Sequence, residues 1–144
     1  MNRNRPWGSF TSETHYEAAR QIGTEDIVLL KNEPVKRQQP ALLPIDPSRY
    51  EKILVVGDNA TRRLTEGGGS SELKVKHEIS PLQGLVELYG DKITYTQGYA
   101  AGRPRYGKVE QPRVDTHSLP RKALEFADDA ALVLISAGLK NNAA

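Results

Sequence analysis

What this chain lacks narrows its function first. Its 144 residues include no cysteine, which excludes disulfides, thiolate zinc sites and cysteine nucleophiles. No apolar run approaches the roughly 18 residues of a membrane-spanning helix, and no apolar core follows the basic start, as a signal peptide would require. The net charge is only +2, and the basic residues are scattered among acidic ones. We therefore expect neither a membrane nor a nucleic acid as partner.

Histidine is also scarce. The three histidines have no ligand-like spacing, so no metal site is expected from His15, His77 and His117. Gly57 is followed by Asp58 rather than by the Gly-x-Gly-x-x-Gly pattern of dinucleotide binding, and no Walker lysine is present. The nucleophile elbow of serine hydrolases is missing too. We expect the chain to use no cofactor.

Apolar runs alternate with helix-forming stretches in the second two thirds of the chain. The run Ile53–Val56 shows no polar alternation, which is typical of a strand covered on both faces. Right-handed connections between successive strands predict an α/β fold with an open, mostly parallel sheet and flanking helices. No helix follows the last strand, so one sheet face is expected to be partly bare. The predicted strands cover 52–56, 92–96 and 131–135, and the predicted helices begin at Pro81, capped by Ser80, and at Pro120.

The first third of the chain gives weaker signals. Thr11 or Ser12 is a suitable cap for a helix running to about Gln21, and Gly23 is expected to end or weaken it. The run 27–31 is β-prone or buried, and Leu42-Leu43 is expected to pack into the core. Later in the chain, the long polar stretch 97–118 predicts either disorder or a functional lid.

The stretch 66–71 reads Glu-Gly-Gly-Gly-Ser-Ser and follows the predicted strand 52–56. Three consecutive glycines suit a backbone that needs positive φ or close approach by a ligand. The two serine hydroxyls can donate and accept hydrogen bonds. Beyond the carboxyl end of a parallel strand, such a loop lies where open α/β sheets bind ligands. The alternative is an ordinary surface loop.

A family resemblance joins these features. Five motifs occur in order at fitting spacing: Thr14 to Asn32, Leu42 to Ile45, Ile53 to Ala60, Gly67 to Ser71 and Ser80 to Leu85. Together they resemble the start of the second, α/β sandwich domain of glycoside hydrolase family 3, in its β-glucosidase-like branch. The resemblance covers about residues 5 to 139. It implies residues 1–26 as an interdomain lead-in with a helix, and 27–144 as part of the sandwich domain.

The resemblance also implies a function and partners. The family's enzymes are retaining glycosidases that act on O-glycosidic bonds of β-linked glucosides or oligosaccharides. Their nucleophilic aspartate lies in a (β/α)8 barrel domain, and their acid/base glutamate lies in a loop soon after the strand matching 131–135. This chain shows neither residue. We therefore expect it to be a fragment of the enzyme that contains no catalytic residue and has no activity alone. Retaining chemistry needs two carboxyl groups roughly 5 Å apart.

What the resemblance leaves is one wall of the sugar site. It implies substrate-binding roles for Gly68, Gly69, Ser70 and Ser71, with Asp58 orienting the loop from behind. Tyr99 and Tyr106 either stack on a sugar ring or pack the long polar loop. The alternative function is a non-catalytic carbohydrate-binding or assembly module that docks on a separate barrel domain.

Overall fold

The computed structural model describes residues 8–9, 12–34, 36, 39–62, 75–100, 104–105, 108–109 and 117–138. The chain forms two compact units, Met1–Ile45 and Asp46–Ala144. In the part that the structure describes, no helix has the length and apolar character needed to cross a membrane.

The second unit is built on a parallel three-stranded sheet, which confirms the predicted α/β fold. Its strands are β1 (Ile53–Val56), β2 (Ile93–Thr96) and β5 (Leu132–Ile135), in the order β2-β1-β5. Ile53 of β1 lies opposite Ile93 on one side and Leu132 on the other, and both pairs are parallel. The first strand in the sequence is therefore the middle strand of the sheet.

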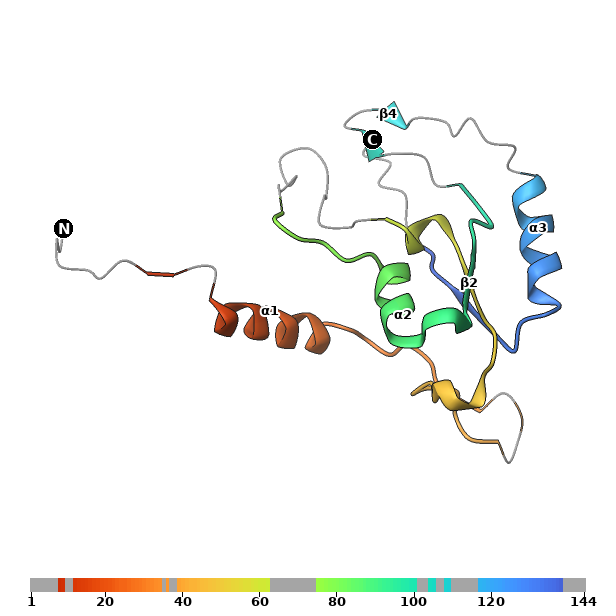
Figure 1. Ribbon diagram of the computed structural model, residues 1–144, viewed down its shortest axis with the longest axis horizontal. Coiled ribbons are helices and arrows are strands. Elements are labelled where there is room, and N and C mark those ends of the chain that lie inside the picture. The colour runs from red at the N-terminus through yellow and green to blue at the C-terminus, as the bar shows by residue number, and fades with distance from the viewer. Residues whose placement is uncertain are drawn as a thin grey trace. The chain divides into compact units, whose positions relative to one another are not determined.

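Two helices cover the sheet from opposite sides (Figure 1). Helix α2 (Pro81–Tyr89) connects β1 to β2, and helix α3 (Ser118–Ala127) connects β2 to β5. Because the second connection passes back across β1, the direction of winding reverses there. The boundary between β1 and β5 is the switch point of this sheet, the place where open α/β folds usually bind ligands.

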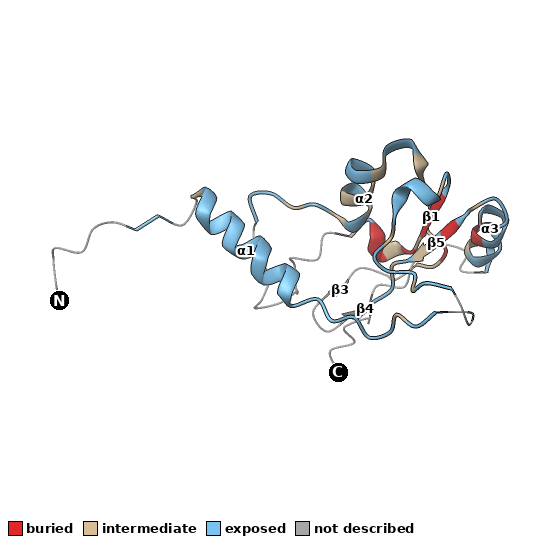
Figure 2. Cartoon of the chain, turned by 90° about the horizontal axis from the view of Figure 1, so that it is seen from below, coloured by how far each residue is buried: buried red, intermediate tan, exposed pale blue. Residues whose placement is uncertain are grey.

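The core of the second unit is small and centred on β1. Ile53, Leu54 and Val55 are at most 1% exposed, which confirms a strand covered on both faces. Figure 2 shows this burial concentrated in the sheet and the adjoining turn. On β5, Val133 and Ile135 point to the same face and are 39% and 72% exposed. The partly bare sheet face expected from the sequence is therefore present at this edge.

Local sequence signals explain both helix starts in part. The hydroxyl of Ser80 accepts a hydrogen bond from the Gln83 amide at 3.2 Å, and Pro81 follows it, as predicted. Helix α3 begins at Ser118, two residues before the predicted start at Pro120. Its Ala123 is buried, whereas Leu124 is 68% exposed.

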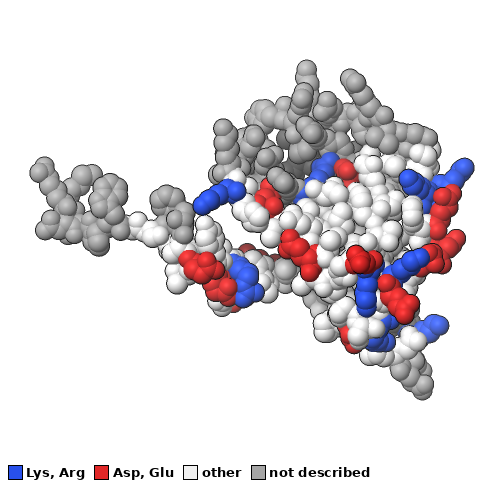
Figure 3. Space-filling model, viewed as in Figure 1, with Lys and Arg blue, Asp and Glu red and all other residues white. Residues whose placement is uncertain are grey.

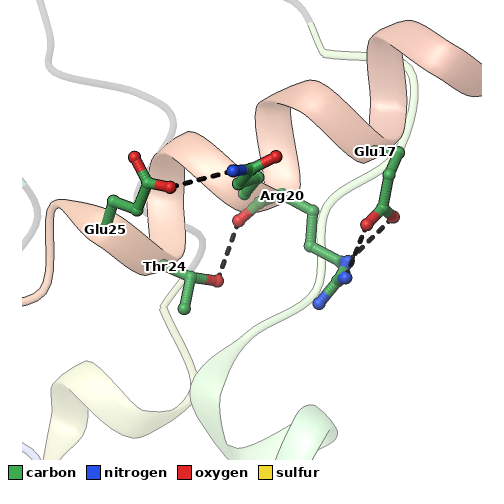
Figure 4. Close-up of polar contacts among 5 residues, drawn as sticks. Glu17, Arg20, Thr24 and Glu25 are labelled. Carbon is green, nitrogen blue, oxygen red and sulfur yellow. Dashed lines mark hydrogen bonds and ion pairs between the residues drawn. The ribbon is translucent and has the colours of Figure 1, made fainter.

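The described residues of the first unit include the helix α1 (Glu13–Glu25), none of whose residues is buried. Polar side chains bond along its surface: Arg20 with Glu17, Gln21 with Glu25, and the Thr24 hydroxyl with the Arg20 carbonyl (Figure 4). Such pairs at three and four residues support an exposed helix. The helix continues through Gly23 to Glu25 instead of ending near Gln21, since a glycine inside a helix weakens it by only about 1 kcal/mol.

Two further expectations for the first unit were wrong. Residues 27–30 form no strand and are exposed, Leu30 most of all at 92%. Leu42 and Leu43 are also exposed. The backbone of Leu43 is instead held by a side chain: its amide donates to Asn32 Oδ1 at 3.0 Å, and its carbonyl accepts from Asn32 Nδ2 at 2.7 Å. Two hydrogen bonds from the Asn32 side chain, rather than apolar burial, therefore hold Leu43 in place.

The stretch 97–118, expected as a disordered loop or lid, contains a short antiparallel pair. It consists of β3 (Pro104–Arg105) and β4 (Lys108–Val109), with Arg105 opposite Lys108. Two-residue strands carry too little pattern to be identified from sequence.

Candidate functional site

The carboxyl ends of the three parallel strands meet at one edge of the sheet, which we call the carboxyl edge. It is formed by Gly57–Ala60 after β1, Gln97–Tyr99 after β2 and Ser136–Gly138 after β5. The ladder continues into it, since the Gly57 amide donates to the Thr96 carbonyl at 3.2 Å and the Ser136 amide to the Val56 carbonyl at 2.8 Å. Strand pairing therefore brings polar residues about 40 and 80 positions apart into one cluster.

Asp58 begins a short 3-10 turn, Asp58–Ala60, directly after β1. Its Oδ1 accepts from Gln97 Nε2 at 3.0 Å, and its Oδ2 accepts from the Arg62 guanidinium at 2.9 Å. The side chains of Arg62 and Asp58 are only 26% and 19% exposed. A partly buried, charge-assisted pair of this kind is stronger than a surface ion pair. Asp58 thus joins the end of β1 to the segment after β2.

Gly57 supports a second connection across the edge. Its φ is +130°, and a Cβ placed on it would lie 2.2 Å from the Ser136 carbonyl oxygen and 2.9 Å from Tyr99 Cε1. The Tyr99 ring uses this free space to pass over the end of β1. Its hydroxyl donates to the Ser136 carbonyl at 2.6 Å. Tyr99, which follows the edge strand β2, thereby holds the segment that follows the other edge strand, β5.

Two further glycines allow close packing at the carboxyl edge. Gly98, with φ of +63°, packs so closely that a Cβ would lie 2.3 Å from Val56 Cγ1. A Cβ on Gly138 would meet Asn59 Nδ2 at 2.2 Å, so the Asn59 amide lies directly beside the chain leaving β5. The segments after β2 and β5 therefore both pack closely against the end of β1 and the turn that follows it.

Tyr95 of β2 lies behind the carboxyl edge. Burial raises the pKa of its hydroxyl, while its hydrogen bond with Thr61 acts in the opposite direction. Thr61 also donates its hydroxyl to the Asp58 carbonyl at 3.0 Å. The hydrogen bonds of Thr61 therefore also connect the turn that carries Asp58 to Tyr95 of the sheet.

The predicted site residues lie partly at the carboxyl edge and partly outside the described residues. Asp58 lies at the carboxyl edge, as its place after the strand implied. The predicted sugar-contacting residues Gly68, Gly69, Ser70 and Ser71 lie outside the described residues, as does Tyr106. Tyr99 belongs to the cluster through its hydrogen bond to Ser136. Gln97 and Ser136 were not identified from the sequence, because nothing in the residues around them signals a partner so far along the chain.

The other tempting groups lie elsewhere. His15, His77 and His117 are all exposed, and no cluster of three metal-binding side chains occurs among residues whose placement is described. Asp129 is an exposed turn residue and forms an ion pair with Lys52. That pair borders a shallow hollow at the opposite, amino edge, lined also by Leu54, Thr94 and Phe126.

In the view of Figure 3, acidic and basic side chains lie interspersed over the described part of one face, and no patch of one sign dominates it.

A family model and several known proteins are similar to this chain. The family model described as "Glycosyl hydrolase family 3 C-terminal domain" matches residues 27–144. Beta-glucosidase BoGH3A of Bacteroides ovatus is 52% identical over 143 residues, which are 99% of this chain and 19% of that protein. Probable beta-glucosidase J of Neosartorya fischeri is 34% identical over 99 residues, 68% of this chain and 10% of that protein.

A solved structure is similar as well. The β-glucosidase EmGH1 of Erythrobacter marinus superposes with a TM-score of 0.63 at 26% identity, over 90% of this chain and 18% of that one. The chain thus spans about a fifth of the length of the first of these curated relatives. Since the family model covers most of the chain, the protein belongs to glycosyl hydrolase family 3, within the C-terminal domain of that family.

Proposed function

We propose that this chain contributes one wall of the sugar site of a retaining, β-glucosidase-like glycoside hydrolase that cleaves O-glycosidic bonds. The observation that carries the proposal is its 52% identity over 143 residues to a protein named beta-glucosidase. In this proposal, residues 1–26 form an interdomain lead-in and 27–144 form part of the α/β sandwich domain. The partner is a (β/α)8 barrel domain, and the substrate is a β-linked glucoside or oligosaccharide.

Asp58 has an orienting role in this proposal rather than a chemical one. A catalytic carboxylate must present an oxygen to the anomeric carbon or to the leaving oxygen. Both oxygens of Asp58 are already engaged, one by Gln97 and one by Arg62. Because Arg62 directly precedes the stretch 63–74, the pair fixes the point from which the glycine-rich loop starts. We propose that Gly68, Gly69, Ser70 and Ser71 contact the sugar from that loop.

The chain alone is proposed to be inactive. Retaining hydrolysis needs a nucleophile and an acid/base roughly 5 Å apart, and the engaged carboxylate of Asp58 supplies neither. What the carboxyl edge offers is hydrogen-bonding groups held by a rigid sheet, which suits positioning of a sugar ring. Its contribution to the enzyme is then binding energy and orientation.

Two measurements test the proposal. The purified chain is first assayed with an aryl β-glucoside, for which we expect no turnover above the blank. Turnover by the chain alone, abolished in an Asp58→Asn variant, would contradict the division of labour. The second measurement is a glucose titration followed by amide resonances. We expect saturable shifts at Gly57, Asp58 and residues 68–71, and none around Lys52 and Asp129 at the amino edge. A carboxyl edge that does not respond to glucose would remove the proposed sugar wall.

A further inference from the structure

We infer that Tyr99 is a positioning residue of the carboxyl edge: it reaches across the end of β1 and fixes the direction in which the chain leaves β5. The inference rests on the proposed function only for its effect on sugar binding. Its geometric part depends on Tyr99, Gly57, Gly98 and Ser136, all of which the structure describes.

The first argument is the path of the side chain. In the order β2-β1-β5, Tyr99 follows one edge strand and Ser136 follows the other, with β1 between them. The Tyr99 hydroxyl nevertheless donates to the Ser136 carbonyl at 2.6 Å. This is possible because Gly57, at the end of the middle strand, has no Cβ in the space that the ring occupies. The bond therefore spans the full width of the sheet.

The second argument is the rigidity of the turn that carries Tyr99. Gln97, Gly98 and Tyr99 form a tight turn in which the Tyr99 amide donates to the Gln97 carbonyl at 2.6 Å. Gly98 adopts a φ of +63°, which is unfavourable for residues with a Cβ, and it packs on Val56. At the start of the same turn, Gln97 bonds to Asp58. One short segment after β2 thus determines where the chain leaves both β1 and β5.

The third argument is what the Ser136 carbonyl controls. Its peptide group includes the amide of Ala137, and Gly138 comes next, in contact with the Asn59 amide. Without the Tyr99 hydroxyl, strand pairing would still hold Ser136 through its amide. The Ser136 carbonyl and the next peptide group would lose their constraint. Ala137 and Gly138 would then sample more orientations relative to the rest of the carboxyl edge.

The test compares Tyr99→Phe with Tyr50→Phe, which makes the same change before β1, at the amino edge. ¹⁵N relaxation is measured on the full 144-residue chain. In Tyr99→Phe we expect the order parameters of Ala137 and Gly138 to fall from about 0.85 toward 0.6 or below. Tyr50→Phe should leave them unchanged. Equal order parameters in Tyr99→Phe and the unaltered chain would overturn the inference.

A second pair of variants protects the test against a misfolded Tyr99→Phe. Gly98→Ala keeps the hydroxyl but displaces the turn, whereas Gly90→Ala meets no atom within 4 Å although its φ is also positive, at +57°. Both changes carry the same kind of backbone strain. Only Gly98→Ala should loosen Ala137 and Gly138; equal effects from both variants would count against a positioning role.

Glucose titrations separate this inference from the proposed function. We expect Tyr99→Phe to weaken glucose binding about three- to tenfold, and Tyr50→Phe to leave it unchanged. If the unaltered chain does not bind glucose, the proposed function fails, while the order parameters still decide the role of Tyr99. Unchanged affinity in Tyr99→Phe, with binding intact in the unaltered chain, would show that the hydroxyl does not serve the site.

Discussion

The guanidinium of Arg62 donates to Oδ2 of Asp58 at 2.9 Å, and both side chains are largely shielded from water. Asp58→Asn removes the negative charge and leaves Arg62 with a weaker acceptor. We expect the free energy of unfolding to fall by about 1–3 kcal/mol. Urea unfolding measures the loss. Asp129→Asn, which breaks the more exposed pair with Lys52 in the same unit, is the control and should cost much less. Equal losses would mean that burial adds nothing to the Asp58 pair.

Gly57 should tolerate no side chain. Gly57→Ala would place a Cβ 2.2 Å from a backbone oxygen, at a φ of +130°. The oxygen cannot move without disturbing β5, so we expect a loss of about 2–4 kcal/mol in denaturant unfolding.

Gly23→Ala is the matched glycine control for that experiment. Gly23 lies inside α1 with no atom within 4 Å of its missing Cβ. Alanine there should raise helix content in circular dichroism and stabilise α1 by about 0.5–1 kcal/mol. If Gly57→Ala were as benign as Gly23→Ala, the close approach of Tyr99 and Ser136 to Gly57 would be wrong.

Tyr95 should make stability depend on alkaline pH. Burial raises the pKa of its hydroxyl above the ordinary value of about 10. The folded chain therefore keeps this proton to a higher pH than the unfolded chain does. The resulting stability is fully present below about pH 10 and is lost as pH rises through the folded pKa. Urea unfolding at several pH values from 8 to 11 should show this decline, and Tyr95→Phe should flatten it.

The titration can be followed directly as well. Absorbance near 295 nm reports tyrosinate, and the ionisation step that disappears in Tyr95→Phe should lie above the ordinary value of about 10 in the folded chain. A Tyr95 step at or below that value would refute the effect of burial.

The central strand should carry most of the stability. Leu54→Ala deletes a side chain that is 1% exposed, and we expect it to cost about 2–5 kcal/mol. Leu30→Ala, at a position 92% exposed, should change the unfolding free energy by no more than about 0.5 kcal/mol. Thermal denaturation of the two variants measures the difference. A large effect at Leu30 would place residues 27–30 in a core after all.

The sequence predicted the parts of the fold that local pattern determines. The unbroken apolar run Ile53–Val56 indicated a covered strand, and Ser80 before Pro81 marked a helix start through capping. Pattern failed at residues 27–30, where the same apolar character occurs in exposed side chains. The length of α1 was underestimated too, since the helix extends past Gly23 to Glu25 with polar side-chain pairs along its surface. Apolar composition indicates what can be buried, and tertiary contacts decide whether it is.

The candidate site was predicted only where it depends on order along the chain. Asp58 follows a parallel strand, so its place at the carboxyl edge could be derived. The partners Gln97 and Ser136 could not, since their bonds depend on strand order and on the positive φ of Gly57 and Gly98. For Tyr99, the sequence indicates either stacking on a sugar ring or packing of the long polar loop. Its hydroxyl bond reflects the missing side chain of a glycine 42 residues earlier, which no local pattern reports.

The place of β1 in the middle of the sheet also bears on how the protein is made. Its Ile53 finds one partner 40 residues later, at Ile93, and the other 79 residues later, at Leu132. Contacts of such high order are slow to form. Of the three strands, the apolar strand β1 is synthesised first, and its pairing partners β2 and β5 are not yet available to it. The nascent chain therefore passes through an interval in which it is exposed to aggregation, and that interval closes only when β5 is translated.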